Sequence, residues 1–491
     1  MSGNSDVLDL WLDGRLAGSL MRGPSDDVEF SYSSDYFGSR GATPLSVSMP
    51  LVQQHYGPVE VMPWLSNLLP DAVEVRDRWA AKFGETRNDP FSLLRHMGQD
   101  APGSVQVVPH GTEPSQLGNL SQITDARIAE RIQEIIEDPD HWVDDSDEDQ
   151  SRFSLGGNQG KFALARIDGQ WFEPNGRTAS THIVKPGMAT VTGHTNAEVQ
   201  AVEFVTMRAS RYLGLATALV KIEEFNGLAA FVTQRYDRIT QPDGTVTRLH
   251  QEDFSQALSF LPTRKYEQNG GPTMADMVAV VDDHSSPQWR AKDRAALAGF
   301  FMYNLLIAGV DAHAKNHSLI LSGNLVRLAP AYDLISAHGM WNADRVRFKS
   351  SAAVRYGKQR PYRRITGRNL ARTADTLLLN RGEFHDRLVD MQQKLPTALA
   401  QAISELPTEM VTDRVKRMAE REKEFGAEVV SRMTLADIAD TPIFDPPSHR
   451  RRSRRNSVWV PGQLKNGAWE LGSYRNRGQS RASATSAQRT S

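Results

Sequence analysis

Alternating apolar and polar residues predict strands in the first part of the chain. Residues 7–13 and 28–32 alternate in this way, and Gly14 follows the first stretch. Both are expected to be antiparallel strands, the first pair forming a hairpin. A helical region ending near His96 completes a small mixed unit over residues 1–110.

Helical spacing of apolar residues becomes dominant further along the chain. Residues 122–137 and 197–213 are predicted helices, and Gly214 is a typical cap for the second. Residues 111–240 are otherwise rich in predicted strands, whereas residues 241–440 are mostly helical. A strand-rich part followed by a helical part predicts an α+β fold with two lobes and a site between them.

Length, composition and charge refine this picture. The 491 residues suggest two to four domains, and 39% of them are apolar, enough for a large core. The formal charge of −2 is the sum of about −10 over residues 1–440 and +8 over residues 441–491, where ten Lys and Arg face two Asp and Glu. This basic tail is predicted to be disordered. It is either a solvated tail or an arm that contacts phosphates of a polyanion such as DNA.

Several classes of protein are excluded or disfavoured. The chain has no cysteine, which excludes disulfides, thiolate catalysis and cysteine-bound zinc or iron–sulfur centres. The first residues lack a basic segment followed by an apolar run, so no secretory signal is expected. The most apolar stretch, 295–310, is too short to cross a membrane. We therefore expect a soluble, cytoplasmic protein with no membrane partner.

The segment 309–333 carries the most informative polar residues. An apolar helix at 295–308 leads into a loop with Asp311 and Asn316, which have the D-x-x-x-x-N spacing of a kinase catalytic loop. Strands at 318–321 and 325–328 then lead to Asp333, where a kinase places its metal-binding aspartate.

Each residue type suits phosphoryl transfer. Asp311 is the candidate base that accepts or orients a substrate hydroxyl proton, and Asn316 and Asp333 offer hard oxygen ligands to Mg²⁺. Lys315 is placed to stabilise the transferring group, and His313 to hold the loop. The alternative is an ordinary polar loop joining a buried helix to a hairpin.

A candidate phosphate loop precedes this segment. It runs from Ser154 to Lys161 and contains Gly156, Gly157 and Gly160, whose backbone N–H groups can approach phosphate oxygens. It matches neither a Walker A motif nor G-x-G-x-x-G, and alone it is also compatible with a plain turn.

A lysine and a carboxylate complete the candidate nucleotide site. The predicted strand 181–185 ends in Lys185, which we expect to pair with nucleotide phosphates and with a carboxylate of helix 197–213, either Glu198 or Glu203. Residues 231–238, with Gln234 and Tyr236, lie where a hinge between lobes would present backbone groups to adenine. An ordinary core strand is the alternative for this last segment.

These motifs, in this order, resemble the HipA family of serine/threonine-protein kinase toxins of type II toxin–antitoxin modules. The stretches that carry the resemblance are 154–161, 182–185, 203–208, 234–238, 249–254, 265–267, 311–316 and 330–336, with 44–50 and 67–70 in the N-terminal unit. The resemblance covers about residues 5–430 and implies a two-lobed protein-kinase-like fold with ATP and Mg²⁺ between the lobes.

The resemblance also implies roles for individual residues. Asp311 matches the catalytic aspartate, Asn316 and Asp333 the metal ligands, and Lys185 the lysine that binds ATP phosphates. Gln234 and Tyr236 match the hinge that meets adenine. Ser154 matches the serine that family members autophosphorylate to switch themselves off, and Ser151 is a neighbouring alternative.

The resemblance also leads us to expect particular substrates and partners. Family substrates include aminoacyl-tRNA synthetases, notably glutamyl-tRNA synthetase, and the usual partner is a helix-turn-helix antitoxin of HipB type. The two together bind operator DNA, to which the basic tail of this chain is a possible second contact.

The phosphate loop departs from the family pattern, because Gly156 to Gly160 stands where Ala-Gly-Ala-Gln is common. Two other functions are kept open at this point: a kinase of a small molecule or lipid, and a DNA-bound co-repressor subunit.

Overall fold

The computed structural model describes most of the chain. The described ranges are 6–114, 121–142, 153–157, 159–174, 178–186, 196–439, 457–460, 463–465, 468–470 and 473–476. The chain divides into two compact units, Met1–Ile438 and Ala439–Ser491. Among the helices in these ranges, none is both long and apolar enough to cross a membrane.

The N-terminal part is built on a five-stranded antiparallel sheet with strand order β4-β3-β2-β1-β5. The strands are β1 (Val7–Leu12), β2 (Arg15–Arg22), β3 (Val28–Tyr32), β4 (His55–Tyr56) and β5 (Val105–Pro109). The helices are α1 (Ser34–Phe37), α2 (Pro58–Ser66), α3 (Val73–Lys82) and α4 (Pro90–Met97). The two strands predicted from alternation are confirmed as β1 and β3. They do not pair with each other, because Asp13 and Gly14, at φ 49° and 70°, turn the chain into β2, which pairs with both.

A six-stranded sheet with order β10-β11-β9-β7-β8-β6 forms the smaller lobe. Its strands are β6 (Ser121–Gln122), β7 (Phe162–Ile167), β8 (Gln170–Glu173), β9 (His182–Lys185), β10 (Val220–Phe225) and β11 (Leu228–Gln234). Helix α5 (Asp125–Glu137) packs on this sheet through Ile128 and Ile132, which share a core with Phe162 and Val184. The predicted strand at 181–185 is thereby placed in the middle of the sheet.

Helices dominate the remainder of the first unit. They are α7 (Phe254–Ala257), α8 (Met274–His284), α9 (Arg290–Leu306), α10 (Ala337–Met340), α11 (Ala343–Lys349), α12 (Gly367–Thr376), α13 (Arg381–Ser404), α14 (Asp413–Ser431) and α15 (Leu435–Ala439). Short strands accompany them: β12 (Arg238–Thr240), β13 (Val246–Arg248), β14 (His250–Asp253), β15 (Ser318–Ser322), β16 (Leu325–Leu328), β17 (Ser351–Tyr356) and β18 (Gln359–Pro361).

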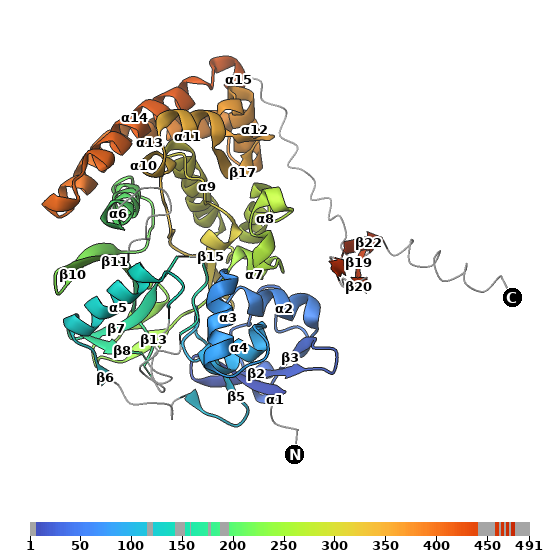
Figure 1. The fold of residues 1–491 in the computed structure, drawn as a ribbon. Coiled ribbons are helices and arrows are strands. Elements are labelled where there is room, and N and C mark those ends of the chain that lie inside the picture. The colour runs from blue at the N-terminus through green and yellow to red at the C-terminus, as the bar shows by residue number, and fades with distance from the viewer. Residues whose placement is uncertain are drawn as a thin grey trace. The chain divides into compact units, whose positions relative to one another are not determined.

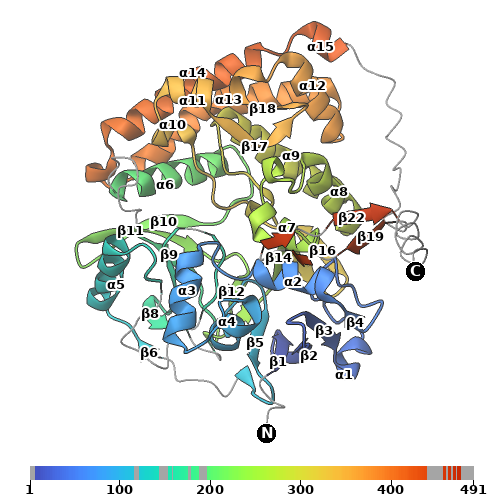
Figure 2. The ribbon, with the colours of Figure 1, turned by 45° about the vertical axis from the view of Figure 1, so that its right-hand side comes forward.

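Helix α6 (Asn196–Tyr212) joins the two lobes. It packs against β10 and β11 of the smaller lobe and against α13 and α14 of the helical lobe (Figures 1 and 2). Its buried residues Val202 and Val205 belong to the same apolar core as Leu305 and Leu399. The predicted helix and its cap are confirmed, since Gly214 adopts φ 82° two residues after the helix ends at Tyr212.

The described residues of the second unit form four short strands: β19 (Ser457–Val460), β20 (Gln463–Lys465), β21 (Ala468–Glu470) and β22 (Ser473–Asn476). β19 pairs with β22 and β20 with β21, both antiparallel. These strands were not predicted from the sequence, and the disorder expected of the tail stays a prediction. The arginine run at 450–455 lies outside the described residues.

Candidate active site

The loop after helix α9 holds the central polar residues. The helix ends where Ala308 adopts φ 51°, and a Cβ on Gly309 would lie 2.2 Å from Asn304 Oδ1, so this turn requires glycine. Asp311 follows, and a 3-10 helix over Ala314–Asn316 leads into β15. The β15–β16 hairpin returns the chain toward Asp333, so the predicted order of helix, loop, hairpin and aspartate is confirmed.

Asp311 is held from three sides and stays partly accessible. The Tyr266 hydroxyl donates to Asp311 Oδ1, and His313 Nε2 lies 3.6 Å from the same oxygen. Asn316 Nδ2 donates to the Asp311 backbone oxygen at 2.7 Å. Burial and the nearby Asp333 carboxylate raise the pKa of Asp311 to about 6. A carboxyl with this pKa is mostly ionised at neutral pH yet basic enough to accept a proton.

His313 packs the loop from inside. Its ring is buried and stands edge-on to Tyr266, with centroids 4.7 Å apart. Burial, together with the Lys265 charge, lowers the pKa of His313 to about 3, so the imidazole is neutral at physiological pH. The role of holding the loop stays a prediction for this residue.

Lys185 joins the two lobes through a pair of carboxylates. Its Nζ lies 2.6 Å from Glu203 Oε1 on α6 and 2.8 Å from Asp333 Oδ1. Burial opposes the charged ammonium, but the two carboxylates outweigh it and raise the pKa of Lys185 above its usual value. The same pairing lowers the pKa of Asp333. Of the two candidates on α6, Glu203 makes this contact, whereas Glu198 lies 3.2 Å from Arg414.

The backbone around Asp333 is unusual. Asp333 adopts φ 57°, a left-handed conformation that non-glycine residues take at a cost and that concentrates at functional sites. The preceding Tyr332 donates to the Lys315 backbone oxygen at 2.7 Å and stacks on Tyr236, with ring centroids 5.8 Å apart. Asp333 thereby follows a residue that is bonded to the loop carrying Asp311 and Asn316.

The phosphate loop lies against these residues. A Cβ on Gly156 would lie 3.3 Å from Lys315 Nζ, and one on Gly157, at φ 101°, would lie 2.7 Å from Lys161 Nζ. Burial and the charge of Lys185 lower the pKa of Lys161 to about 8. Lysine ammonium groups thus lie against the backbone of two glycines, an arrangement suited to phosphate oxygens.

Ser154 is fully buried in the same loop. Its hydroxyl donates to the Leu68 backbone oxygen, and its N–H donates to the Asp100 backbone oxygen at 3.1 Å. Both partners belong to the N-terminal part of the chain, which therefore holds the phosphate loop. Ser151 and Asn158 lie outside the described residues.

Asn316 and Asp333 are the residues that could hold a divalent metal. Within the described ranges, no group of three or more His, Asp or Glu is arranged to bind a metal by itself. A carboxylate and an amide on neighbouring loops nevertheless fit Mg²⁺, which commonly takes its other ligands from water and substrate phosphates.

The two predicted hinge residues have different surroundings. Tyr236 lies beside Tyr332, and its hydroxyl donates to Gln251 Oε1. The Gln234 side chain is exposed and lines a separate cavity of about 340 Å³ with Phe204 and Arg208. The Gln234 side chain is not brought together with the other candidate residues, and its N–H already donates to the Leu219 oxygen.

Three residues at the site, Asp71, Lys265 and Tyr266, were assigned no individual role from the sequence. Asp71 lies between two lysines, with Lys265 Nζ and Lys315 Nζ each 2.7 Å from one of its carboxylate oxygens. These charges lower the pKa of Asp71 to about 2 against the opposing effect of burial. Tyr266 contacts Asp311. The stretches 67–70 and 265–267 were recognised as motifs, but nothing in their local pattern indicates these long-range partners.

A buried charge network lies next to the hinge segment. Asp100 of the N-terminal part lies 3.1 Å from Arg238 Nη2 and 3.7 Å from Arg235 Nη1. Asp237 lies 2.8 Å from Arg235 and 2.9 Å from Arg238, and Asp100 also accepts hydrogen bonds from the N–H and hydroxyl of Ser180. The network ties the N-terminal part to both lobes.

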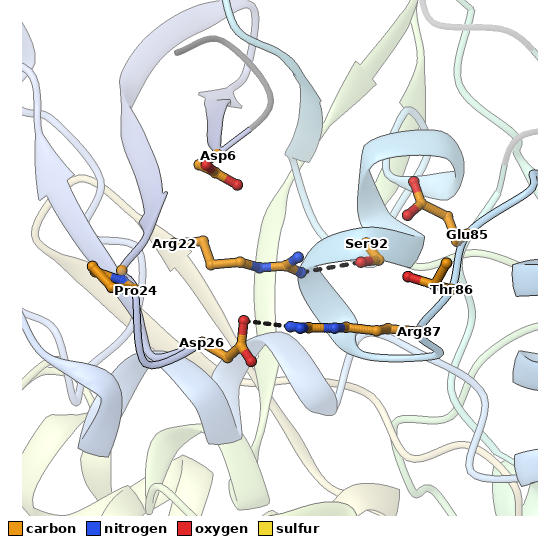
Figure 3. A pocket seen from close by; sticks show the side chains of 9 residues that line it. Asp6, Arg22, Pro24, Asp26, Glu85, Thr86, Arg87 and Ser92 are labelled. Atoms are coloured by element: carbon orange, nitrogen blue, oxygen red, sulfur yellow. Dashed lines mark hydrogen bonds and ion pairs between the residues drawn. The ribbon is translucent and has the colours of Figure 1, made fainter. Parts of the chain in front are cut away.

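A further cavity of about 450 Å³ lies in the N-terminal part and contains none of the candidate residues (Figure 3). Charged side chains that line it are ion-paired: Arg87 pairs with Asp26 in the lining, and Arg22 lies 2.5 Å from Asp89 outside it.

Comparison with known proteins agrees with this geometry. Residues 153–406 match the model of the HipA-like C-terminal domain, and residues 8–108 match that of the HipA N-terminal domain. The protein Y4mE of Sinorhizobium fredii is 34% identical over 331 residues, 67% of this chain and 77% of its own length. The serine/threonine-protein kinase toxin HipA of Shewanella oneidensis is 28% identical over 411 residues, 82% of this chain and 90% of its own.

A solved structure gives the same result. HipA of Shewanella oneidensis, in a complex with HipB and operator DNA, superposes with a TM-score of 0.74 at 26% identity, covering 89% of this chain and all of that one. The predicted two-lobed, kinase-like α+β fold is confirmed. The chain belongs to the HipA family of serine/threonine-protein kinase toxins, and it is an enzyme of the kinase class.

Proposed function

We propose that this enzyme transfers the γ-phosphoryl group of ATP, with Mg²⁺, to a serine or threonine hydroxyl of a protein. The observation that carries the proposal is the ion-paired set Glu203–Lys185–Asp333 next to a loop that presents Asp311 and Asn316. This set couples a phosphate-binding lysine to a metal-binding carboxylate and places a candidate base beside both.

In this mechanism Asp311 orients the substrate hydroxyl and takes its proton. The hydroxyl oxygen forms a bond to the γ-phosphorus while the bond between that phosphorus and the β–γ bridging oxygen breaks, leaving ADP. Lys185 and Lys315 offset negative charge on the phosphates. Mg²⁺ held by Asn316 and Asp333 would neutralise further charge.

Autophosphorylation of Ser154 is part of the proposal. Its hydroxyl is buried and bonded to Leu68, so the loop must leave this position before Ser154 can receive a phosphoryl group. A phosphoserine would place a dianion beside a backbone carbonyl oxygen, which opposes return of the loop. Modification would therefore hold the enzyme in a state that cannot bind nucleotide phosphates.

Substrate and partner assignments rest on family membership. We propose an aminoacyl-tRNA synthetase, such as the glutamyl enzyme, as the substrate in the cytoplasm. The Shewanella oneidensis relative is found with HipB and its operator DNA. By extension, a helix-turn-helix antitoxin and operator DNA are the proposed partners, with the basic tail as an additional DNA contact.

The test is transfer of labelled γ-phosphate by wild type and by Asp311→Asn. We expect wild type to label itself and a synthetase, and Asp311→Asn to bind Mg-ATP without transfer. Rapid labelling of a small alcohol without any labelling of protein would instead favour a small-molecule kinase. Unchanged toxicity and operon repression by Asp311→Asn would favour a non-catalytic role on DNA.

A further inference from the structure

The N-terminal part contributes a carboxylate to the centre of the active site. Asp71 follows the turn after helix α2, yet its side chain lies among residues of the other two parts of the fold. Oδ1 lies 2.7 Å from Lys315 Nζ in the catalytic loop, and Oδ2 lies 2.7 Å from Lys265 Nζ. The Asp71 N–H donates to the Gly157 backbone oxygen at 3.0 Å.

This single residue therefore contacts both halves of the phosphoryl-transfer site. Its backbone holds the phosphate loop at Gly157, and its carboxylate holds the lysine that faces that loop at Gly156. A lysine side chain has four rotatable bonds and loses much rotamer freedom when it is fixed, so an ammonium that is already anchored costs less entropy to use during the reaction.

Charge balance also requires Asp71. The side chains of Asp71, Lys265 and Lys315 are all at most 12% exposed. Without the carboxylate, two ammonium groups drawn to one position would repel each other in a poorly solvated space, and Lys315 would move away from Gly156.

We propose that Asp71 is a positioning residue for phosphoryl transfer, which fixes Lys315 against the phosphate loop and so makes the N-terminal part a component of the active site. This inference rests on the kinase function proposed above. It assigns Asp71 no contact with substrate, because both of its oxygens are used by the lysines.

The test is Asp71→Asn, which keeps the size and the backbone N–H but removes the charge. We expect kcat for γ-phosphate transfer to fall at least tenfold, while the Kd for Mg-ADP, which lacks the γ-phosphate, changes less than threefold. Asp9→Asn is the matched control, because Asp9 is a buried carboxylate of the N-terminal part whose oxygens bond with Ser19, His110 and Gly111, away from both loops of the site. Its kcat should equal that of wild type.

A second variant separates positioning from a purely structural contact. Replacing Lys265 in the Asp71→Asn background with Met removes the repulsion, so Asp71→Asn/Lys265→Met should recover a several-fold part of the lost kcat.

Several results would overturn the inference. They are a wild-type kcat in Asp71→Asn, a parallel loss of Mg-ADP binding and transfer, an equal loss in Asp9→Asn, or no recovery in the double variant. Failure of the proposed function itself is distinguishable, because wild type would then transfer no phosphate to protein.

Discussion

The pH dependence of transfer offers a direct test of Asp311 as the base. A base must be deprotonated, and the pKa of Asp311 is raised to about 6, so activity is expected above pH 6 and lost below it. The ionised fraction falls from about nine tenths at pH 7 to about one tenth at pH 5, an almost tenfold loss of rate. The assay is the initial rate of labelled γ-phosphate transfer at saturating Mg-ATP and constant ionic strength.

Tyr266→Phe makes this test specific. The Tyr266 hydroxyl donates to Asp311 and holds its pKa down, so the variant should raise that pKa. A hydrogen bond to a charged group contributes about 1.5 kcal/mol or more, which corresponds to about one pKa unit. With the pKa near 7, the wild-type to variant rate ratio should be about five times larger at pH 6 than at pH 8.

The rates are compared as the ratio of wild type to variant, because protonation of the nucleotide changes both rates equally and cancels in the ratio. Tyr212→Phe is the matched control, since the Tyr212 hydroxyl contacts Arg208 and not Asp311. A Tyr266→Phe ratio that stays constant from pH 6 to pH 8, or an acid limb that moves downward, would refute the reasoning about Asp311.

Other predictions follow from the ion pairs. Glu203→Gln should lower kcat at least tenfold with little change in folding, while Glu198→Gln, on the same helix but away from Lys185, should stay within twofold; radiolabel transfer and thermal melting check both. Asp100→Ala should lower the free energy of unfolding by about 3–5 kcal/mol in guanidinium titrations, because Arg235 and Arg238 then share the single carboxylate of Asp237 in a buried site. Truncation after Ile438 should leave transfer intact and reduce both DNA affinity and the slope of its salt dependence.

Local pattern was sufficient to predict the parts of the site that are contiguous in sequence. Asp311, Asn316 and Asp333 lie on one helix–loop–hairpin segment whose order is visible in the apolar periodicity. The choice between Glu198 and Glu203 was not available, because residues five apart on a helix point about 140° from each other and only the fold decides which meets Lys185. The short strands of the tail were not predicted, because its polar and basic composition favours disorder.

The contacts that could not be predicted join residues far apart in the sequence. Lys315 meets Asp71 across 244 positions, and Tyr266 meets Asp311 across 45. Neither contact follows from periodicity, which describes neighbours within one element.

The same pairs mean that the N-terminal part is not a detachable accessory. Removing it would strip Ser154 and Gly157 of backbone partners, Lys315 of the Asp71 carboxylate, and Arg235 of Asp100. Each loss exposes a buried group or removes one of its partners, at a cost of about 1–3 kcal/mol for a neutral group and more for a charge. The matched HipA-like C-terminal region therefore contains Asp311 and the glycine-rich loop but lacks Asp71, which contacts both Lys315 and Gly157.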